Sequence, residues 1–147
     1  RMRSVERVRG LYQRIRSLSY EGMKLVTGDP VASQMTAVES GPEDQGDVAV
    51  GGCAAGVSGL TFLADGTIVP CRRLPVPLGN IRTDAVREIW AASPVLEALR
   101  TRNRYPGKCG ACRRWATCRG CRAIASAASL HEGPGSALAD DPQCFLA

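Results

Sequence analysis

The thirteen residues Cys109-Gly-Ala-Cys-Arg-Arg-Trp-Ala-Thr-Cys-Arg-Gly-Cys121 contain four of the seven cysteines of this 147-residue chain. Two, five and two residues separate the successive thiols. Thiolates packed this densely repel one another and oxidise readily unless a metal neutralises them. The spacing therefore predicts a metal or cluster site around this segment.

The other three cysteines lie far from this segment, and we expect the fold to return them to it: Cys53, Cys71 and Cys144. Seven thiols divide as four plus three, which fills one four-coordinate site and leaves a second site one thiolate short. An odd number of cysteines with two Cys-x2-Cys pairs favours a reducing compartment, and we expect a cytoplasmic protein. A disulfide framework is the alternative.

The spacing also bears on the kind of metal. Four-cysteine zinc sites normally separate their Cys-x2-Cys pairs by roughly 15 to 20 residues, whereas five residues separate them here. Iron–sulfur clusters accept short, uneven spacings, and the last thiol of a close-spaced run commonly ligates a neighbouring cluster. The spacing favours iron–sulfur and leaves zinc open. The sole histidine, His131, is expected on the surface.

The net charge of +5 is unevenly placed. Residues 1–16 contain six Arg and one Glu, and residues 100–122 contain eight Lys and Arg without a carboxylate. The second run surrounds the thiols, where positive charge offsets that of a thiolate-bound cluster. The first run follows an amphipathic pattern, so we expect a solvated or docking helix face and no nucleic-acid partner. No apolar run is long enough to span a membrane.

The chain divides into three predicted parts: a helix over residues 1–28, a linker over 29–50 and a cysteine-rich domain over 51–147. Helical spacing predicts the helix from about Met2 to Leu25, ended by Gly28-Asp29-Pro30. Its predicted buried face is Val5, Val8, Leu11, Ile15 and Leu18. Within the linker, Val48–Val50 is a candidate strand.

The domain over residues 51–147 is predicted to be of the α+β class, with one β-hairpin and several short helices. Asp65-Gly66 lies between two β-rich runs, which predicts a hairpin turn that brings Cys53 and Cys71 to one end of a small sheet. A helix is expected from Thr83 or Asp84, with Val86, Ile89 and Trp90 buried. Ser93-Pro94 predicts an N-cap followed by proline at the first helical position, and this helix should end at Pro106-Gly107. Ala123–Leu130 is a further predicted helix.

The complete cysteine pattern resembles the SPASM domain, the C-terminal auxiliary-cluster domain of many radical S-adenosylmethionine enzymes. The resemblance covers about residues 50 to 145 and includes the segments Asp65-Gly66-Thr67, Val69-Pro70-Cys71, Gly79-Asn80-Ile81, Glu88-Ile89-Trp90 and Cys118-Arg119-Gly120-Cys121-Arg122-Ala123. Many members have three residues between the last two cysteines of the run, where this chain has two. The shorter gap is similar to the haem-biosynthesis branch.

The resemblance implies two 4Fe-4S clusters. It assigns one cluster to Cys109, Cys112, Cys118 and Cys144, and the other to Cys53, Cys71 and Cys121. The second cluster would have an open iron, available to substrate, water or a side chain other than cysteine. Asp47 is a candidate fourth ligand, with a solvated linker carboxylate as the alternative.

The Cys-x3-Cys-x2-Cys motif that binds the catalytic cluster and S-adenosylmethionine in this family is absent from the sequence. We therefore expect an upstream barrel to carry that third cluster and S-adenosylmethionine, and this chain to be inactive alone. The resemblance implies a peptide, protein or tetrapyrrole substrate and a reductant such as flavodoxin or ferredoxin. The auxiliary clusters would relay electrons or anchor substrate. A stand-alone ferredoxin-type protein and a zinc-stabilised interaction module are the alternative functions.

Overall fold

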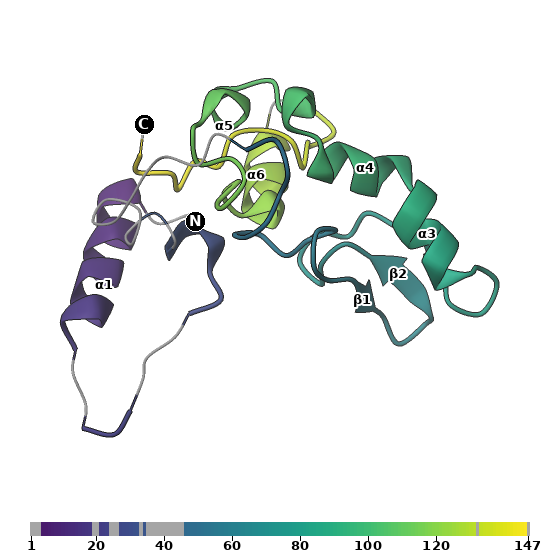
Figure 1. Ribbon diagram of the computed structural model, residues 1–147, viewed down its shortest axis with the longest axis horizontal. Coiled ribbons are helices and arrows are strands. Elements are labelled where there is room, and N and C mark those ends of the chain that lie inside the picture. Colours follow the sequence, from purple (N-terminus) through teal and green to yellow (C-terminus); the bar gives the residue numbers. More distant parts are fainter. Residues whose placement is uncertain are drawn as a thin grey trace.

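The computed structural model describes residues 4–18, 21–23, 27–32, 34, 46–131 and 133–146. Short helices and a three-stranded antiparallel sheet make up the described fold, which confirms the α+β class. The α-helices are α1 (Val5–Ser17), α3 (Val86–Ala92), α4 (Pro94–Arg100), α5 (Lys108–Ala111) and α6 (Arg122–Ser129). Figure 1 shows α5 and α6 in the middle, with α1 on one side and the sheet with α3 on the other.

The predicted hairpin is present and is extended by a third strand that the sequence did not predict. β1 (Thr61–Phe62) pairs with β2 (Thr67–Val69), which in turn pairs with β3 (Gly79–Asn80). The turn forms because the Asp65 carboxylate accepts the Thr67 N–H at 2.9 Å and Gly66 has a φ of +90°. Two-residue β3 has no alternating apolar pattern, so its pairing could not be recognised locally.

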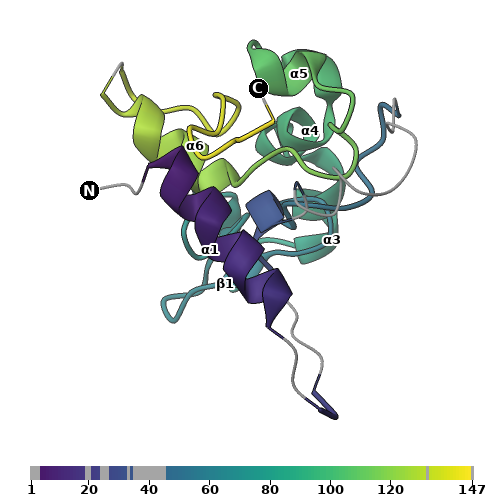
Figure 2. The ribbon, with the colours of Figure 1, turned by 90° about the vertical axis from the view of Figure 1, so that its left-hand side faces the viewer.

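Helix α1 is shorter than predicted, and its buried face keeps the predicted Val8 but takes Tyr12 in place of Leu11. It begins after its N-cap, Ser4, and ends at Ser17, because Leu18 is already extended. Val8 and Tyr12 are its buried residues, whereas Leu11 is 51% exposed. Val8 and Tyr12 pack against Val31, which comes from a 3-10 turn over Pro30–Ala32. Figure 2 shows α1 crossing in front of the rest of the molecule.

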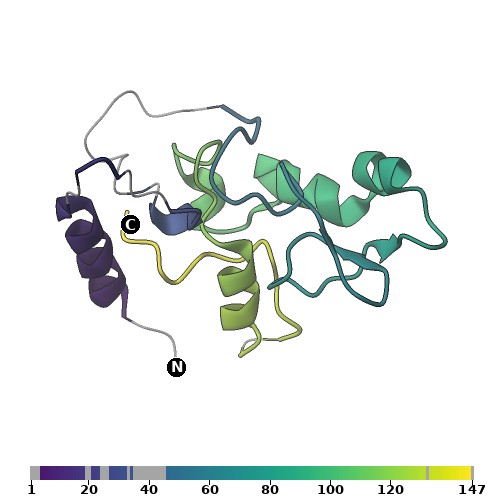
Figure 3. The same ribbon diagram turned by 90° about the horizontal axis from the view of Figure 1, so that it is seen from below.

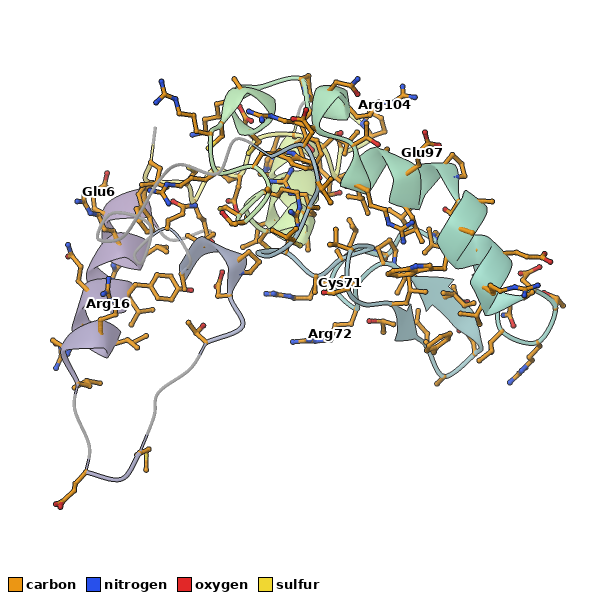
Figure 4. All side chains as sticks on the ribbon, viewed as in Figure 1. Glu6, Arg16, Cys71, Arg72, Glu97 and Arg104 are labelled. Atoms are coloured by element: carbon orange, nitrogen blue, oxygen red, sulfur yellow. The ribbon has the colours of Figure 1, made fainter. Side chains whose placement is uncertain are left out.

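Helices α3 and α4 follow each other directly through Ser93. Its side chain accepts the Leu96 N–H at 3.5 Å, and Pro94 is at the first helical position, which confirms the predicted cap. Helix α4 ends at Arg100 rather than at Pro106-Gly107, and a 3-10 turn over Arg102–Arg104 follows. Glu97 and Arg104 project outward from this region (Figure 4).

The start of α3 also differs from the prediction. Asp84 does not cap the helix, because its carboxylate accepts the Asn80 N–H at 2.6 Å, and α3 begins at Val86. Its predicted buried side is only half-buried. Trp90 instead lies under the guanidinium of Arg100, 4.2 Å from the ring centroid.

The segment that leads into the sheet passes under α4. Leu96 and Leu99 are buried, and a Cβ at Gly56 would meet Leu96 Cδ2 at 2.8 Å. Arg100 donates to the Gly56 carbonyl at 2.6 Å, so α4 is tied to the residues just after Cys53. Val48 and Val50 are exposed and form no strand, although the Val50 N–H bonds to the Ala116 carbonyl.

Helix α6 corresponds to the predicted helix over Ala123–Leu130, displaced by one residue. After it, the C-terminal segment returns across the centre of the molecule toward α1, as Figure 3 shows from below. Phe145 there packs against the cluster of Val8, Tyr12 and Val31. No helix within the described ranges is long and apolar enough to cross a membrane.

Candidate metal centre

Four of the predicted ligands line a single cavity of about 620 Å³. They are Cys109, Cys112, Cys118 and Cys144, the four that the family resemblance assigns to one cluster. Cys109 and Cys118 are buried, and Cys112 and Cys144 are partly buried. None of the seven cysteines forms a disulfide.

Two adjacent carboxylates in the C-terminal segment, residues 133–146, hold the cysteine-rich loop, residues 109–121, in place. Asp140 accepts the N–H groups of Lys108 and Cys109 at 3.0 and 2.9 Å, and so caps the short helix α5. Asp141 is fully buried and accepts the Cys121 N–H at 2.6 Å. Because the Cys144 N–H bonds back to the Asp141 carbonyl, the same turn carries the last thiol to the cavity.

The other three thiols belong to the segment of residues 109–121 or to segments that contact it. Cys71 packs against a small apolar cluster of Leu74, Cys121 and Ala123, and Figure 4 shows Cys71 at the end of the sheet nearer to α6. Cys53 is joined to the cysteine-rich loop by its N–H, which donates to the Cys118 carbonyl at 3.2 Å. Cys121 also interacts electrostatically with Cys53.

Two buried arginines lie between the two groups of thiols. The guanidinium of Arg119 donates to four backbone carbonyls, including those of Gly51 and Cys53 at 2.6 and 2.9 Å. Arg122 donates to the carbonyls of Ala137 and Ala139. Neither guanidinium forms an ion pair with a carboxylate in the described part of the chain.

Buried positive charge is costly unless negative charge lies nearby. The exposed fractions of Arg119 and Arg122 are 2% and 1%, and burial lowers the pKa of Arg119. Four thiolates around a cluster carry net negative charge, which matches the sign that these guanidinium groups require. The four thiols and the two guanidinium groups therefore fit a thiolate-bound cluster in this cavity.

The cavity wall also supplies N–H groups to sulfur. The N–H groups of Arg114 and Gly120 lie 3.4 Å from the Sγ atoms of Cys112 and Cys118. Arg122 Nη2 is 3.7 Å from Cys109 Sγ. Such contacts stabilise a thiolate.

Burial, unlike these contacts, favours the protonated thiol over the thiolate. It raises the pKa values of Cys109, Cys121 and Cys144 above the ordinary value for cysteine. Metal binding must therefore displace these protons, because the thiolate is the ligand.

The thiols are not drawn together as they would be around one ion. Among the described residues, no group of three or more His, Cys, Asp or Glu side chains is arranged to hold a single metal ion. A four-iron cluster keeps its ligand sulfurs further apart than a single tetrahedral ion does, because iron and sulfide fill the space between them. The positions of the thiols are thus compatible with a cluster, and zinc remains the alternative metal.

Residues 53–122 match the family model of the SPASM domain, an iron–sulfur cluster-binding domain. Over this segment the chain is similar to SPASM domains. It includes six of the seven cysteines and leaves Cys144 outside. No solved structure matches the chain.

The curated relatives are proteins named AdoMet-dependent heme synthase. The chain is 42% identical over 95 residues to the one from Methanosarcina barkeri, which covers 64% of this chain and 26% of the relative. It is 36% identical over 99 residues to those from Nitratidesulfovibrio vulgaris and Oleidesulfovibrio alaskensis, with 67% of this chain covered. The chain thus spans about a quarter of the length of these relatives.

The structure also places side chains at the four-thiol cavity that the sequence analysis did not select. Asp140 and Asp141 hold both cysteine pairs, but an Asp-Asp in a tail carries no local signal of such contacts. Gln34, also buried, reaches the cavity from far upstream. Trp115 is fully buried beside the thiols, and its indole N–H has no acceptor among the described residues.

Two other residues singled out from the sequence, a carboxylate and the sole histidine, are exposed. The Asp47 carboxylate pairs with Arg102 at 3.2 Å, and its side chain is 81% exposed, as a solvated carboxylate would be. His131 is exposed, as predicted.

Proposed function

We propose that this chain binds two 4Fe-4S clusters as the auxiliary-cluster part of a radical S-adenosylmethionine enzyme. One cluster is held by Cys109, Cys112, Cys118 and Cys144, and the other by Cys53, Cys71 and Cys121. The observation that carries the proposal is the single cavity lined by the first four thiols, beside two buried guanidinium groups that form no ion pair with a carboxylate of the described residues. When bound, such clusters supply one-electron transfer.

The residues of the chain have separate tasks in this proposal. Arg119 and Arg122 provide the compensating positive charge and tie the Cys53 segment and the C-terminal segment to the cysteine-rich loop. Asp140 and Asp141 orient the two Cys-x2-Cys pairs through their backbone N–H groups. Trp115 fills the space behind the thiols and limits the entry of water, which sets the potential and the access to the site.

The relatives suggest which longer enzyme the chain serves. Because they are named AdoMet-dependent heme synthases, we propose a tetrapyrrole substrate for the whole protein, ahead of a peptide or protein. The clusters would relay an electron from the substrate radical or anchor substrate at the open iron of the three-thiol site. The catalytic cluster and S-adenosylmethionine would belong to a barrel joined to this chain, reduced by flavodoxin or ferredoxin in the cytoplasm.

The same proposal divides the chain as the sequence suggests. Residues 1–28 would form a helix that belongs to the barrel or bridges to it, residues 29–50 a linker, and residues 51–147 the cluster domain. The contact of Val8 and Tyr12 with Phe145 supports a close association of the first part with the end of the third.

The test is the metal content of the anaerobically reconstituted chain together with its electron paramagnetic resonance spectrum. We expect about eight iron and eight sulfide per chain for two four-iron clusters. Two matched variants separate the sites: Cys112→Ser should remove the signal of one cluster and Cys71→Ser that of the other, each with about half of the iron lost.

Three outcomes would contradict parts of the proposal. Stoichiometric zinc without sulfide would indicate the zinc-stabilised module instead. Loss of both signals in each single variant would contradict the division into two ligand sets. Reversible reduction of both clusters in a gene product that contains no barrel would favour a stand-alone ferredoxin-type protein.

A further inference from the structure

Gln34 reaches the four-thiol cavity from a segment that lies outside the SPASM match. Only 1% of its surface is exposed, and it lines the cavity. Its side-chain amide nitrogen lies 3.8 Å from Cys118 Sγ. Its side-chain oxygen accepts the Phe145 N–H at 3.0 Å. One buried amide therefore connects a proposed cluster ligand with the residue that follows Cys144.

The orientation of this amide is defined by its two partners. A backbone N–H can only donate, so the Gln34 oxygen must face Phe145. The NH2 group of the same amide then points to the other side, where the Cys118 sulfur lies. Sulfur in a thiolate is an acceptor, so the arrangement is an N–H···S contact. Cys118 Sγ also receives the Gly120 N–H at 3.4 Å.

Two side-chain donors reach thiols of the four-thiol group. Gln34 reaches Cys118, and Arg122 reaches Cys109. The contacts of the Gln34 amide are with Cys118 and Phe145, on the side of the four-thiol group. A change at Gln34 can therefore alter one cluster while the other serves as an internal reference.

We propose that Gln34 is a positioning residue that raises the reduction potential of the cluster held by Cys109, Cys112, Cys118 and Cys144. This inference rests on the proposed function. Reduction adds negative charge to a thiolate-bound cluster, and an N–H donor to its sulfur stabilises that charge more in the reduced than in the oxidised state. The bond to Phe145 fixes the amide so that this donor does not rotate away.

The test uses two apolar variants of similar size, Gln34→Leu and Gln34→Met, with the reconstituted full chain. We expect both to retain the iron content of the wild type and to shift the midpoint potential of the four-thiol cluster to a more negative value, as followed by an electron paramagnetic resonance redox titration. The potential of the three-thiol cluster should stay unchanged. Gln13→Leu is the matched control, because Gln13 is exposed on α1.

Each other outcome overturns the inference. An unchanged potential in a fully loaded variant would show that the N–H···S contact has no effect on the cluster. An equal shift of both clusters, or a similar shift in Gln13→Leu, would indicate a general change of the protein. Loss of iron from the four-thiol cavity in both variants would make Gln34 a structural residue only. Absence of any iron–sulfur cluster in the wild type would instead contradict the proposed function.

Discussion

Arg119 lies in the left-handed region with a φ of 57°, which a non-glycine residue adopts at some cost. Gly120, at 58°, continues the turn, and together they let Cys118 and Cys121 face different groups of thiols. The strained backbone is held by the Arg119 side chain, whose guanidinium binds carbonyls of its own loop and of the Cys53 segment. Gly52, with a φ of +70°, is needed where these segments touch, because a side chain there would collide with the backbone of Cys118.

The ionisation of Tyr105 predicts how the stability of the fold depends on pH. It is buried, its hydroxyl donates to the Leu99 carbonyl at 2.8 Å, and burial raises its pKa to about 12 from 10.0. The unfolded chain therefore releases this proton at a lower pH than the folded chain. The contribution of this pKa shift to the free energy of unfolding is complete below pH 10 and is lost as the pH rises toward 12.

We expect Tyr105→Phe to remove this part of the alkaline pH dependence. Near neutral pH the variant should be less stable by about 1 kcal/mol, because the Leu99 carbonyl loses its hydrogen bond. The difference from the wild type should shrink as the pH rises above about 10. Urea unfolding of both cluster-containing proteins at several alkaline pH values measures this difference in stability. A difference that stays constant with pH would contradict the pKa shift.

At the scale of elements, helix α4 connects the sheet side of the molecule to the cysteine-rich loop. Its N-cap is also the last residue of the α3 turn, so Ser93 ends one helix and begins the next. From α4, Leu96 and Leu99 pack on Gly56, close to Cys53. At its other end the chain turns through Tyr105, whose ring contacts Trp115 edge to face at 5.7 Å.

We expect Ser93→Ala to destabilise the domain by about 1 kcal/mol, because the Leu96 N–H loses its side-chain acceptor. Urea unfolding followed by tryptophan fluorescence reports on the change, since Trp90 precedes the cap and Trp115 lies beside the thiols. Ser58→Ala, at an exposed turn position, is the control and should change little. Equal stabilities of Ser93→Ala and the wild type would show that Pro94 alone suffices to begin α4.

At the scale of the whole molecule, the apolar core is divided into small clusters, and two of them contain cysteine. Cys109 belongs to the cluster with Tyr105, Trp115 and Ala116, and Cys121 to the one with Leu74 and Ala123. Metal bound by thiolates contributes directly to folding in such small domains. We infer that the iron–sulfur clusters hold together segments of the chain that the small apolar clusters alone would hold only weakly.

Removing iron with a chelator under anaerobic, reducing conditions should therefore abolish the cooperative unfolding transition. The near-ultraviolet circular dichroism of Trp115 and Tyr105 should weaken, because their contact lies against the cavity wall. Reconstitution with iron and sulfide should restore both signals, which controls for irreversible damage. An unchanged unfolding midpoint after complete removal of iron would show that the apolar clusters fold the chain without metal.

The sequence alone determined the features that depend on neighbouring residues. The cysteine spacings predicted the similarity to SPASM domains, Asp65-Gly66 predicted the hairpin turn, and Ser93-Pro94 predicted the start of α4. Each depends on residues a few positions apart, so a short stretch of sequence is enough to predict it. The short gap between Cys118 and Cys121 likewise indicated the haem-biosynthesis branch, and the relatives are named heme synthases.

Only the tertiary structure decided which distant residues complete the cavity and which face of α1 is buried. Asp140 and Asp141 meet the cysteine pairs 20 or more residues away, and Gln34 meets Cys118 across 84 residues. Val8 is buried as predicted, whereas contact with Val31 and Phe145 buries Tyr12 and leaves Leu11 exposed. Such contacts depend on how the chain returns to itself, because packing and hydrogen-bond partners are chosen between segments that no local pattern connects.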